Sequence, residues 1–225
     1  KWLEQHNNDY QQHPIKKKAR LMTFTLGAKI PPLTVLKSYL GPDGKEVSAW
    51  PGVFSRDHMD IGCRFFIQQI SQLNTLSGKI IDLGCGNGLL SLACLQYFPK
   101  QEIELILCDD SSLAIESAEM NLIARGYTQA KLHHTDALLN VDTRADTILC
   151  NPPFHSGNRI STAAAERMFK QAAKLLAKDG QLLVIANRHL PYAPLLKKGF
   201  KSIQQLNCDA KFVIYQCKDA LPPKR

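Results

Sequence analysis

The stretch DLGCGNG, residues 82–88, decides the fold, because it joins a short apolar run to the start of a helical pattern. The run before it is KIIDL (79–83), and LLSLACLQYF (89–98) follows it with the apolar spacing of a helix. Glycines at 84, 86 and 88 permit a tight turn whose backbone can lie directly against a ligand. The stretch therefore predicts a ligand site at the carboxyl end of a strand.

Strands and helices alternate along the chain after this turn. Predicted strands cover residues 103–108, 131–134, 147–150, 181–187 and 211–217. Predicted helices cover residues 111–126 and 161–180, the second with Ser161 or Thr162 as its cap and Gly180 as its stop. Short apolar strands separated by helices indicate an α/β fold of the doubly wound class, with a mostly parallel sheet and helices on both faces.

The amino-terminal part of the chain has a different pattern. Residues 1–20 are polar with little apolar periodicity, which predicts a linker or arm. Residues 21–50 combine apolar runs with turn material at 31–32 (PP) and 41–46 (GPDGKE), which predicts a small strand-rich elaboration packed on the main domain. A helix is expected within 62–73, and the main domain is expected to span 51–220 with a tail at 221–225.

The composition narrows the class of partner and the compartment. The 225 residues include 28 lysines and arginines against 20 acids, a formal net charge of +8. This excess favours a polyanionic partner such as a nucleic acid, although many proteins are simply basic. Seven cysteines without a C-x-x-C pair fit a reducing cytoplasm better than a disulfide framework or a zinc site. No apolar stretch reaches the roughly 18 residues of a transmembrane helix, so no membrane partner is expected.

Acidic residues at three predicted strand ends limit the kinds of ligand that the site can bind. The glycine spacing is not that of a dinucleotide site, and the Asp82 carboxylate would repel a pyrophosphate but suit an ammonium group. Asp109 can accept both hydroxyls of a ribose diol, and Asp110 either caps the next helix or contacts an adenine edge. Asp136 can accept a hydrogen bond from an adenine amine. Together these features predict S-adenosylmethionine; singly, each has an alternative role in helix packing or capping.

The tetrapeptide NPPF, residues 151–154, follows the fourth strand and so points to the same edge of the sheet. The lone pair of a nucleobase amine is delocalised into the ring, and catalysis has to redirect it. The Asn151 side-chain oxygen and the Pro152 carbonyl can each accept one amine hydrogen, which also stabilises the positive charge that develops on nitrogen. Phe154 offers a ring on which a flat substrate can stack. The alternative is an ordinary turn after a strand.

At these residues the sequence resembles the class I S-adenosylmethionine-dependent methyltransferases. NPPF is similar to the tetrapeptide of amino methyltransferases, which act on adenine or guanine amines or on a protein glutamine amide. More narrowly, WPGVFSRDHMDIG (50–62), NPPFH (151–155), VIANRHLPY (184–192) and KFVIYQ (211–216) resemble the bacterial ribosomal RNA guanine methyltransferases that modify the exocyclic 2-amino group. The resemblance covers about residues 50–217, and within the group it is greater to the large-subunit (23S) enzymes than to the small-subunit ones.

The resemblance implies the Rossmann-like class I methyltransferase fold with a mostly parallel seven-stranded sheet. It implies target-amine positioning at Asn151, Pro152 and Phe154. Phe54, Ser55 and Arg56 resemble the family's segment over the cofactor entrance, with Arg56 either meeting the methionine carboxylate or forming a structural salt bridge. With the reasoning from strand ends, the expected cofactor-binding set is Asp82, Gly84, Cys85, Gly86, Gly88, Asp109, Asp110, Asp136, Ala137 and Asn151. No metal is expected.

Relatives in that group also carry an N-terminal half that is a degenerate methyltransferase-like domain. This sequence lacks it and begins at Lys1, so we expect a fragment of a longer chain. The leading hypothesis is a ribosomal RNA guanine methyltransferase that flips the target base out of its stack. A small-subunit target, DNA adenine or protein glutamine, and a non-catalytic RNA-binding assembly module stay open. Basic residues that either hold phosphates or are ordinary solvated charges are Lys170, Lys174, Lys178, Arg188, Lys197 and Lys198.

Overall fold

A computed structural model of the chain describes residues 9–25, 36–153 and 162–222. The contacts within the chain divide it into two units, residues 1–35 and 36–225. In the first unit, β1 (Gln11–Gln12) and β2 (Met22–Thr23) form a two-stranded antiparallel pair. Part of the region expected to be a linker or arm is therefore a strand. The expected boundaries near residues 20 and 50 stay predictions.

The second unit begins with an antiparallel hairpin of β3 (Lys37–Leu40) and β4 (Glu46–Ala49). Its turn is the GPDGKE segment, where Gly41 N donates to the Lys45 carbonyl at 2.8 Å and Gly44 has a φ of +73°. The hairpin packs on α4 (Ser112–Ile123), and Ser48 N donates to Asn121 Oδ1 at 2.9 Å. With β1 and β2, these strands confirm the expected strand-rich elaboration as two antiparallel pairs.

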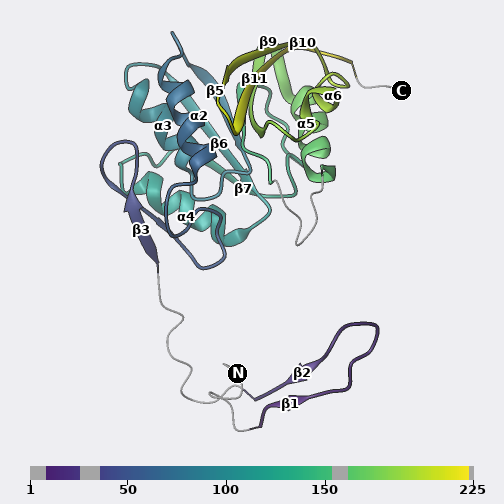
Figure 1. Cartoon of the computed structure of the whole chain (residues 1–225). Coiled ribbons are helices and arrows are strands. Elements are labelled where there is room, and N and C mark those ends of the chain that lie inside the picture. The colour runs from purple at the N-terminus through teal and green to yellow at the C-terminus, as the bar shows by residue number, and fades with distance from the viewer. Residues whose placement is uncertain (1–8, 26–35, 154–161, 223–225) are drawn as a thin grey trace. The chain divides into compact units, whose positions relative to one another are not determined.

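The main sheet has seven strands in the order β10-β11-β9-β8-β5-β6-β7 (Figure 1). Five strands are parallel, namely β5 (Gly78–Leu83), β6 (Ile103–Asp109), β7 (Lys131–His134), β8 (Ala145–Cys150) and β9 (Leu176–Asn187). The last strands, β10 (Phe200–Cys208) and β11 (Phe212–Ala220), run antiparallel to their neighbours. The predicted doubly wound fold with a mostly parallel seven-stranded sheet is confirmed.

Helices cover both faces of this sheet (Figure 1). One face packs against α2 (Ile61–Ser71), α3 (Leu89–Tyr97) and α4 through a core that includes Phe66, Leu92 and Leu122. The other face packs against α5 (Ala163–Leu175) and α6 (Tyr192–Leu196) through a core that includes Phe169. Both faces of the central strands are thus buried, which explains why these strands read as continuous apolar runs.

The sequence-based boundary between α5 and β9 is wrong. The helix was expected to continue to Gly180, but it ends at Leu175 and β9 starts at Leu176, which is 3% exposed in the core. A Cβ at Gly180 would lie 2.9 Å from the Ala145 carbonyl oxygen, so this glycine allows two strands to approach rather than ending a helix. At the other end Thr162 makes no side-chain capping bond, and Ser161 lies outside the described residues.

Two elements of the second unit were not predicted from the sequence. The edge strand β10 is largely polar and partly exposed, so its residues lack the apolar pattern of the central strands. The helix α6 has only five residues and starts after Pro191, too short for a helical period to be recognised. Both flank the carboxyl-terminal half of the sheet, and neither supplies a residue to the cavity described next.

Candidate functional site

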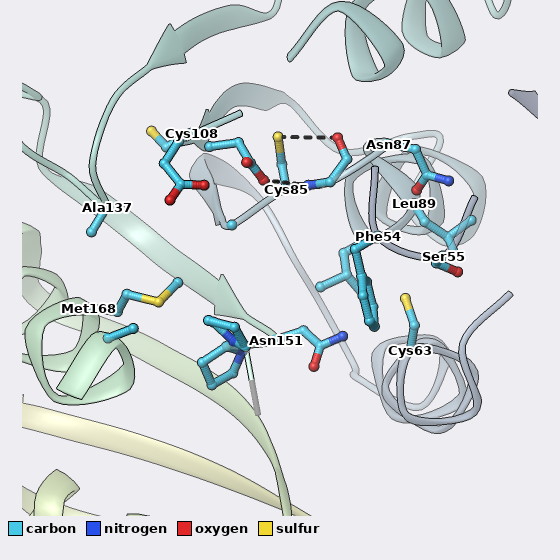
Figure 2. A pocket seen from close by; sticks show the side chains of 18 of the residues that line it. Phe54, Ser55, Cys63, Cys85, Asn87, Leu89, Cys108, Ala137, Asn151 and Met168 are labelled. Carbon is cyan, nitrogen blue, oxygen red and sulfur yellow. Dashed lines mark hydrogen bonds between the residues drawn. The ribbon is translucent and has the colours of Figure 1, made fainter. Parts of the chain in front are cut away.

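A cavity of about 250 Å³ opens where the parallel strands β5, β6 and β8 end (Figure 2). Parts of the chain far apart in sequence meet there: the glycine turn after β5, the acids after β6, the turn after β7, the NPP segment after β8, and side chains of α2 and α5. The lining residues are Phe54, Ser55, Cys63, Gly84, Cys85, Gly86, Asn87, Leu89, Leu90, Cys108, Asp109, Asp110, Asp136, Ala137, Asn151, Pro152, Pro153, Ala164, Arg167 and Met168.

The three glycines of the turn have different roles. All have positive φ, +74° at Gly84, +54° at Gly86 and +80° at Gly88. A Cβ at Gly86 would meet nothing within 4 Å, so this backbone borders open space in the cavity wall. Gly88 does not line the cavity; a Cβ there would lie 3.1 Å from the Cβ of Ala118 in α4. The first two glycines therefore shape the wall, and the third lets α3 start against α4.

Asp109 holds the glycine turn from the end of β6. Gly86 N donates to its Oδ2 and Ser111 N to its Oδ1, both at 2.9 Å. Burial raises the pKa of Asp109, and the two backbone N–H groups oppose that rise by stabilising the carboxylate. Each oxygen keeps a lone pair, so the carboxylate can still accept hydroxyl hydrogens from a ligand. Asp110 is exposed and lines the cavity, whereas the cap of α4 is Ser111, so the capping alternative for Asp110 is wrong.

Asp82 does not line the cavity. Its side chain is fully buried, and Oδ2 accepts hydrogen bonds from Ser91 N at 3.1 Å and Ser91 Oγ at 2.7 Å. Burial raises its pKa to about 7, partly opposed by the Ser91 hydrogen bonds. Its Oδ1 atom is buried with no hydrogen-bond partner among the described residues. Any effect of Asp82 on a ligand is therefore electrostatic and passes through the glycine turn.

The turn after β7 faces α5 across the cavity. Ala137 is buried with a positive φ of +52°, and the Asp136 Oδ1 pairs with Arg167 Nη2 at 3.0 Å. Both side chains are about half exposed, so this ion pair is worth little in stability. Leu138 N donates to Gln171 Oε1 at 2.6 Å, which adds a second link to the same helix. Sequence patterns do not indicate that α5 lines the site, because Met168 fits the apolar face of this helix and Arg167 its solvated face.

Asn151 is the polar residue most clearly set up for a ligand. Its Oδ1 atom is buried and has no hydrogen-bond partner in the described part of the chain. Figure 2 shows its carboxamide on the same side of the cavity as Phe54 and Cys63. A buried oxygen without a partner costs free energy, so it signals a missing donor. Pro152 also lines the cavity, whereas Phe154 and His155 lie outside the described residues.

The segment before α2 forms another wall. Phe54 is 58% exposed and lines the cavity together with Ser55, whose φ is +59°. Ser55 Oγ donates to the His58 carbonyl at 2.6 Å and accepts from Asp60 N at 2.8 Å. These bonds hold the segment in a compact loop. Arg56 is half-buried and is not among the lining residues, so the structure does not bring it to the cavity, where one of its two expected roles would place it.

Cys63, in the first turn of α2, was not predicted as a site residue. Its backbone N donates to Asp60 Oδ2 at 2.9 Å, which caps the helix, and its side chain lines the cavity. Burial and the nearby Asp82 and Asp60 carboxylates raise the pKa of the thiol far above its usual range. The thiol is therefore neutral at physiological pH and is not a nucleophile.

A hydrogen-bond network links the β3–β4 hairpin to the glycine turn. Asn87 Nδ2 donates to the Tyr39 hydroxyl at 2.9 Å, and the Asn87 carbonyl accepts from Asn121 Nδ2 at 2.9 Å. The same Asn121 amide donates to the Ser48 carbonyl at 2.8 Å. Burial raises the pKa of Tyr39, so its hydroxyl stays protonated. Sequence patterns do not reveal this network, because its members lie in four separate segments.

Within residues 9–25, 36–153 and 162–222, no cluster of three or more His, Cys, Asp or Glu side chains is placed to hold a metal ion. A search of the same residues finds no helix with the length and apolar character that crossing a bilayer requires.

Comparison with known proteins identifies the family of the domain that contains this cavity. A family model described as "Methyltransferase small domain" matches residues 44–216. The chain belongs to this methyltransferase family. The match covers the cavity residues that the structure describes, the β4 strand and most of the seven-stranded sheet. The glycine turn and the NPP segment are therefore parts of one methyltransferase domain.

Curated relatives of this methyltransferase domain include ribosomal RNA methyltransferases. A ribosomal RNA large subunit methyltransferase G from Alcanivorax borkumensis is 40% identical over 173 residues, 76% of this chain and 44% of the relative. A ribosomal RNA small subunit methyltransferase C from Escherichia coli is 35% identical over 174 residues, 77% of this chain and 49% of the relative. The chain thus spans about half the length of the curated relatives it matches.

A solved structure shows the same fold. It is a 16S rRNA N2 methyltransferase from T. thermophilus in complex with AdoMet and guanosine, with a TM-score of 0.79 and 24% sequence identity. The alignment covers 96% of this chain and 59% of that one. At this identity the likeness is one of fold, and it agrees with the strand order and helix layers described above.

Proposed function

We propose that the domain transfers a methyl group from S-adenosylmethionine to the exocyclic 2-amino group of a guanine in ribosomal RNA, and that the RNA is that of the large subunit. The observation that carries the proposal is the buried, unpartnered Asn151 oxygen in the wall of a cavity bordered by the glycine turn. An amine N–H is the donor that this oxygen lacks.

The residues present fit S-adenosylmethionine. When bound, the cofactor supplies an electrophilic methyl group on a positively charged sulfur. The Gly84–Gly86 backbone would lie against its amino-acid part, and Asp109 would accept the ribose hydroxyls. Asp136 and Ala137 would border the adenine. Asp82 does not touch the cavity, but when ionised its carboxylate would attract the positively charged cofactor. Because Asp82 is fully buried, water would screen this attraction only weakly.

Asn151 and the Pro152 carbonyl would hold the target amine. Accepting both amine hydrogens turns the nitrogen lone pair away from conjugation with the ring and toward the methyl group. The same oxygens stabilise the positive charge that grows on nitrogen during transfer. The prolines fix the backbone and offer no competing N–H. Cys63 stays neutral at the cavity wall, so it neither attacks the methyl group nor adds charge. The described cavity residues thus act by positioning and electrostatics.

The choice of RNA rests on the relatives. Both curated groups act on ribosomal RNA by their names, and the 40% identical relative is a large-subunit enzyme. The net charge of +8 suits a polyanionic substrate. A small-subunit RNA is the second candidate, because relatives of that name are 35% identical over a similar length.

The test is methyl transfer from tritium-labelled S-adenosylmethionine to unmodified large-subunit RNA, small-subunit RNA and DNA, followed by digestion and separation of nucleosides. Label in N2-methylguanosine from large-subunit RNA alone is expected. Label from small-subunit RNA alone would move the proposal to the other subunit. Label in methyladenosine, or no RNA label while the cofactor binds, would overturn the guanine assignment.

A further inference from the structure

A second asparagine in the structure shares the unusual state of Asn151. Asn187 is the last residue of β9, is 8% exposed, and its Oδ1 atom is buried without a hydrogen-bond partner in the described residues. Its main chain is well satisfied, because its carbonyl accepts from Leu190 N at 3.0 Å. The oxygen that lacks a donor is therefore on the side chain, as it is in Asn151.

The strand register places the two asparagines on the same face of the sheet. Strands β8 and β9 are parallel neighbours, with Leu149 beside Leu183 and Cys150 beside Val184. Leu149, Leu183 and Ile185 all belong to the core beneath α2 and α3. Side chains alternate along a strand, so Asn151 and Asn187 continue that face at the carboxyl ends. Asn187 lies one strand further from the glycine turn than Asn151.

Contacts of α2 connect the strand partner of Asn187 with the cavity. Asn187 pairs with Phe212 of β11, and a Cβ on Gly62 would lie 3.0 Å from the Phe212 ring. The next residue, Cys63, lines the cavity that also holds Asn151. The first turn of α2 therefore lies against Phe212, the strand partner of Asn187, and borders the cavity that holds Asn151. The methyl donor is expected over the ends of β5 and β6. The acceptor base therefore has to lie on the opposite side of Asn151, toward β9 and its last residue, Asn187.

We propose that Asn187 Oδ1 accepts the N1–H of the target guanine, beside the 2-amino group held at Asn151. Guanine presents N1–H and the 2-amino group as adjacent donors on one edge, and two neighbouring acceptor oxygens match that pair. Adenine presents a bare N1 lone pair at the corresponding place, which would face an oxygen and leave it unpaired. Asn187 thus selects guanine over adenine. This inference rests on the proposed function and names the base-reading residue of the same site.

The test is a cycle that changes enzyme and substrate together. An RNA fragment spanning the methylated guanosine is made with guanosine or with 2-aminopurine riboside at that position; 2-aminopurine keeps the 2-amino group but has no N1–H. The wild-type kcat/KM is expected to fall roughly ten- to a hundredfold on 2-aminopurine, because the buried oxygen is left unpaired. Asn187→Ala should lose a similar factor on guanosine, and most of the discrimination between the two bases should disappear.

Two further variants complete the design. Asn187→Asp keeps an acceptor oxygen and should recover part of the guanosine activity. Asn207→Ala, on the edge strand β10, is the matched control: its side-chain oxygen already accepts from Cys208 N at 2.9 Å, and full discrimination should remain. Wild-type discrimination in Asn187→Ala, or in Asn187→Leu should the alanine variant not fold, would overturn the inference alone, because neither side chain has an acceptor oxygen. A wild-type enzyme that methylates no guanine would overturn the proposed function, and this inference with it.

Discussion

At the residue scale, Asn151 decides between an enzyme and a binding module. Replacing it with alanine removes one of two acceptors for the target amine, so the rate of methyl transfer should fall by about two to three orders of magnitude. Single-turnover transfer with saturating RNA measures this rate. The dissociation constants for S-adenosylmethionine and RNA should change little. A variant with the wild-type rate would show that the oxygen has no part in transfer, as expected of a non-catalytic module.

The buried carboxyl group of Asp82 should make the stability of the fold depend on pH. Its pKa is about 7 in the folded protein and about 3.9 in an unfolded chain, so between these values only the folded state holds the proton. Stability should therefore fall as pH rises from 4 to 7 and then level off. Between pH 5 and pH 8 the loss should be on the order of 2 kcal/mol.

Urea unfolding of the wild type and of Asp82→Asn at both pH values measures this effect. The asparagine is neutral throughout, so the variant should lack this part of the pH dependence. Equal pH dependence in the two proteins would contradict a raised pKa at Asp82. Other titrating groups contribute equally to both proteins and cancel in the comparison.

Two glycines of the turn should respond differently to alanine. Gly88→Ala should cost roughly 3 kcal/mol of unfolding free energy, because a positive φ is combined with a Cβ lying 3.1 Å from Ala118. Gly86→Ala meets no neighbour and should cost about 1 kcal/mol, but its methyl group enters the cavity and should weaken cofactor binding. Urea unfolding and calorimetric titration separate the effects. A reversed order of stabilities would contradict these separate roles.

Some of the site could be predicted residue by residue. Gly84, Cys85 and Gly86 of the glycine turn were expected at the ligand together with Asp109, Asp110, Asp136 and Asn151, and all of these line one cavity. Their signal is local, since each follows a recognisable strand. Asp82 and Gly88 belong to the same motif but point into the protein, which depends on how α3 and α4 pack. The lining residues Cys63 and Met168 could not be recognised, because their positions depend on tertiary packing alone, whereas Asn87 lies within the glycine motif but was not singled out.

At the scale of elements, the β3–β4 hairpin supports the glycine turn. The Tyr39 hydroxyl accepts the hydrogen bond from Asn87, and Asn87 is 3% exposed. Tyr39→Phe leaves that buried amide without this partner, so cofactor affinity should fall about three- to tenfold. Isothermal titration with S-adenosylmethionine measures the loss. Tyr97→Phe, at a half-exposed ring on α3, should leave affinity unchanged. An unaltered affinity in Tyr39→Phe would show that the hairpin does not support the site.

The elements that could be predicted are those whose pattern of apolar residues reflects how they are buried. Central strands such as β5 and β6 are buried on both faces and read as apolar runs. The junction of α5 and β9 could not be placed, because Leu176 is apolar in either element and Gly180 resembles a helix stop. A glycine is needed at position 180 because a Cβ there would lie too close to the Ala145 carbonyl oxygen. This contact comes from the neighbouring strand β8, so the local sequence does not reveal it.

At the scale of the whole molecule, charge is unevenly distributed along the chain. Residues 36–153 contain nine lysines and arginines against fourteen acids, whereas residues 162–222 contain ten against four. Several of these cations gather around a groove at the amino ends of the parallel strands, away from the cofactor cavity. Its charged lining residues are Arg144, Lys174, Lys178, Lys201 and Asp219. This half of the domain is where phosphates are expected to bind.

The double variant Lys174→Glu with Lys201→Glu tests this surface. RNA affinity should fall, and the slope of log affinity against log salt should lessen by about two. Fluorescence anisotropy over a salt series provides both values. Lys45→Glu with Lys100→Glu makes the same charge change at exposed positions in residues 36–153, where acids outnumber lysines and arginines. If the two double variants lost affinity equally, net charge rather than this groove would explain RNA binding.

The two unpartnered asparagine oxygens also have a consequence for which mutations this sequence would accumulate over time. In the absence of a ligand each buried oxygen destabilises the folded chain, and an apolar side chain of similar size would remove that penalty. Mutation guided by stability alone would therefore tend to erase Asn151 and Asn187. A copy of this domain that no longer modified its target would drift toward greater stability and lose them early. If both oxygens bind the target base as proposed, their joint presence is expected in a protein that is selected for turnover and not for folding alone.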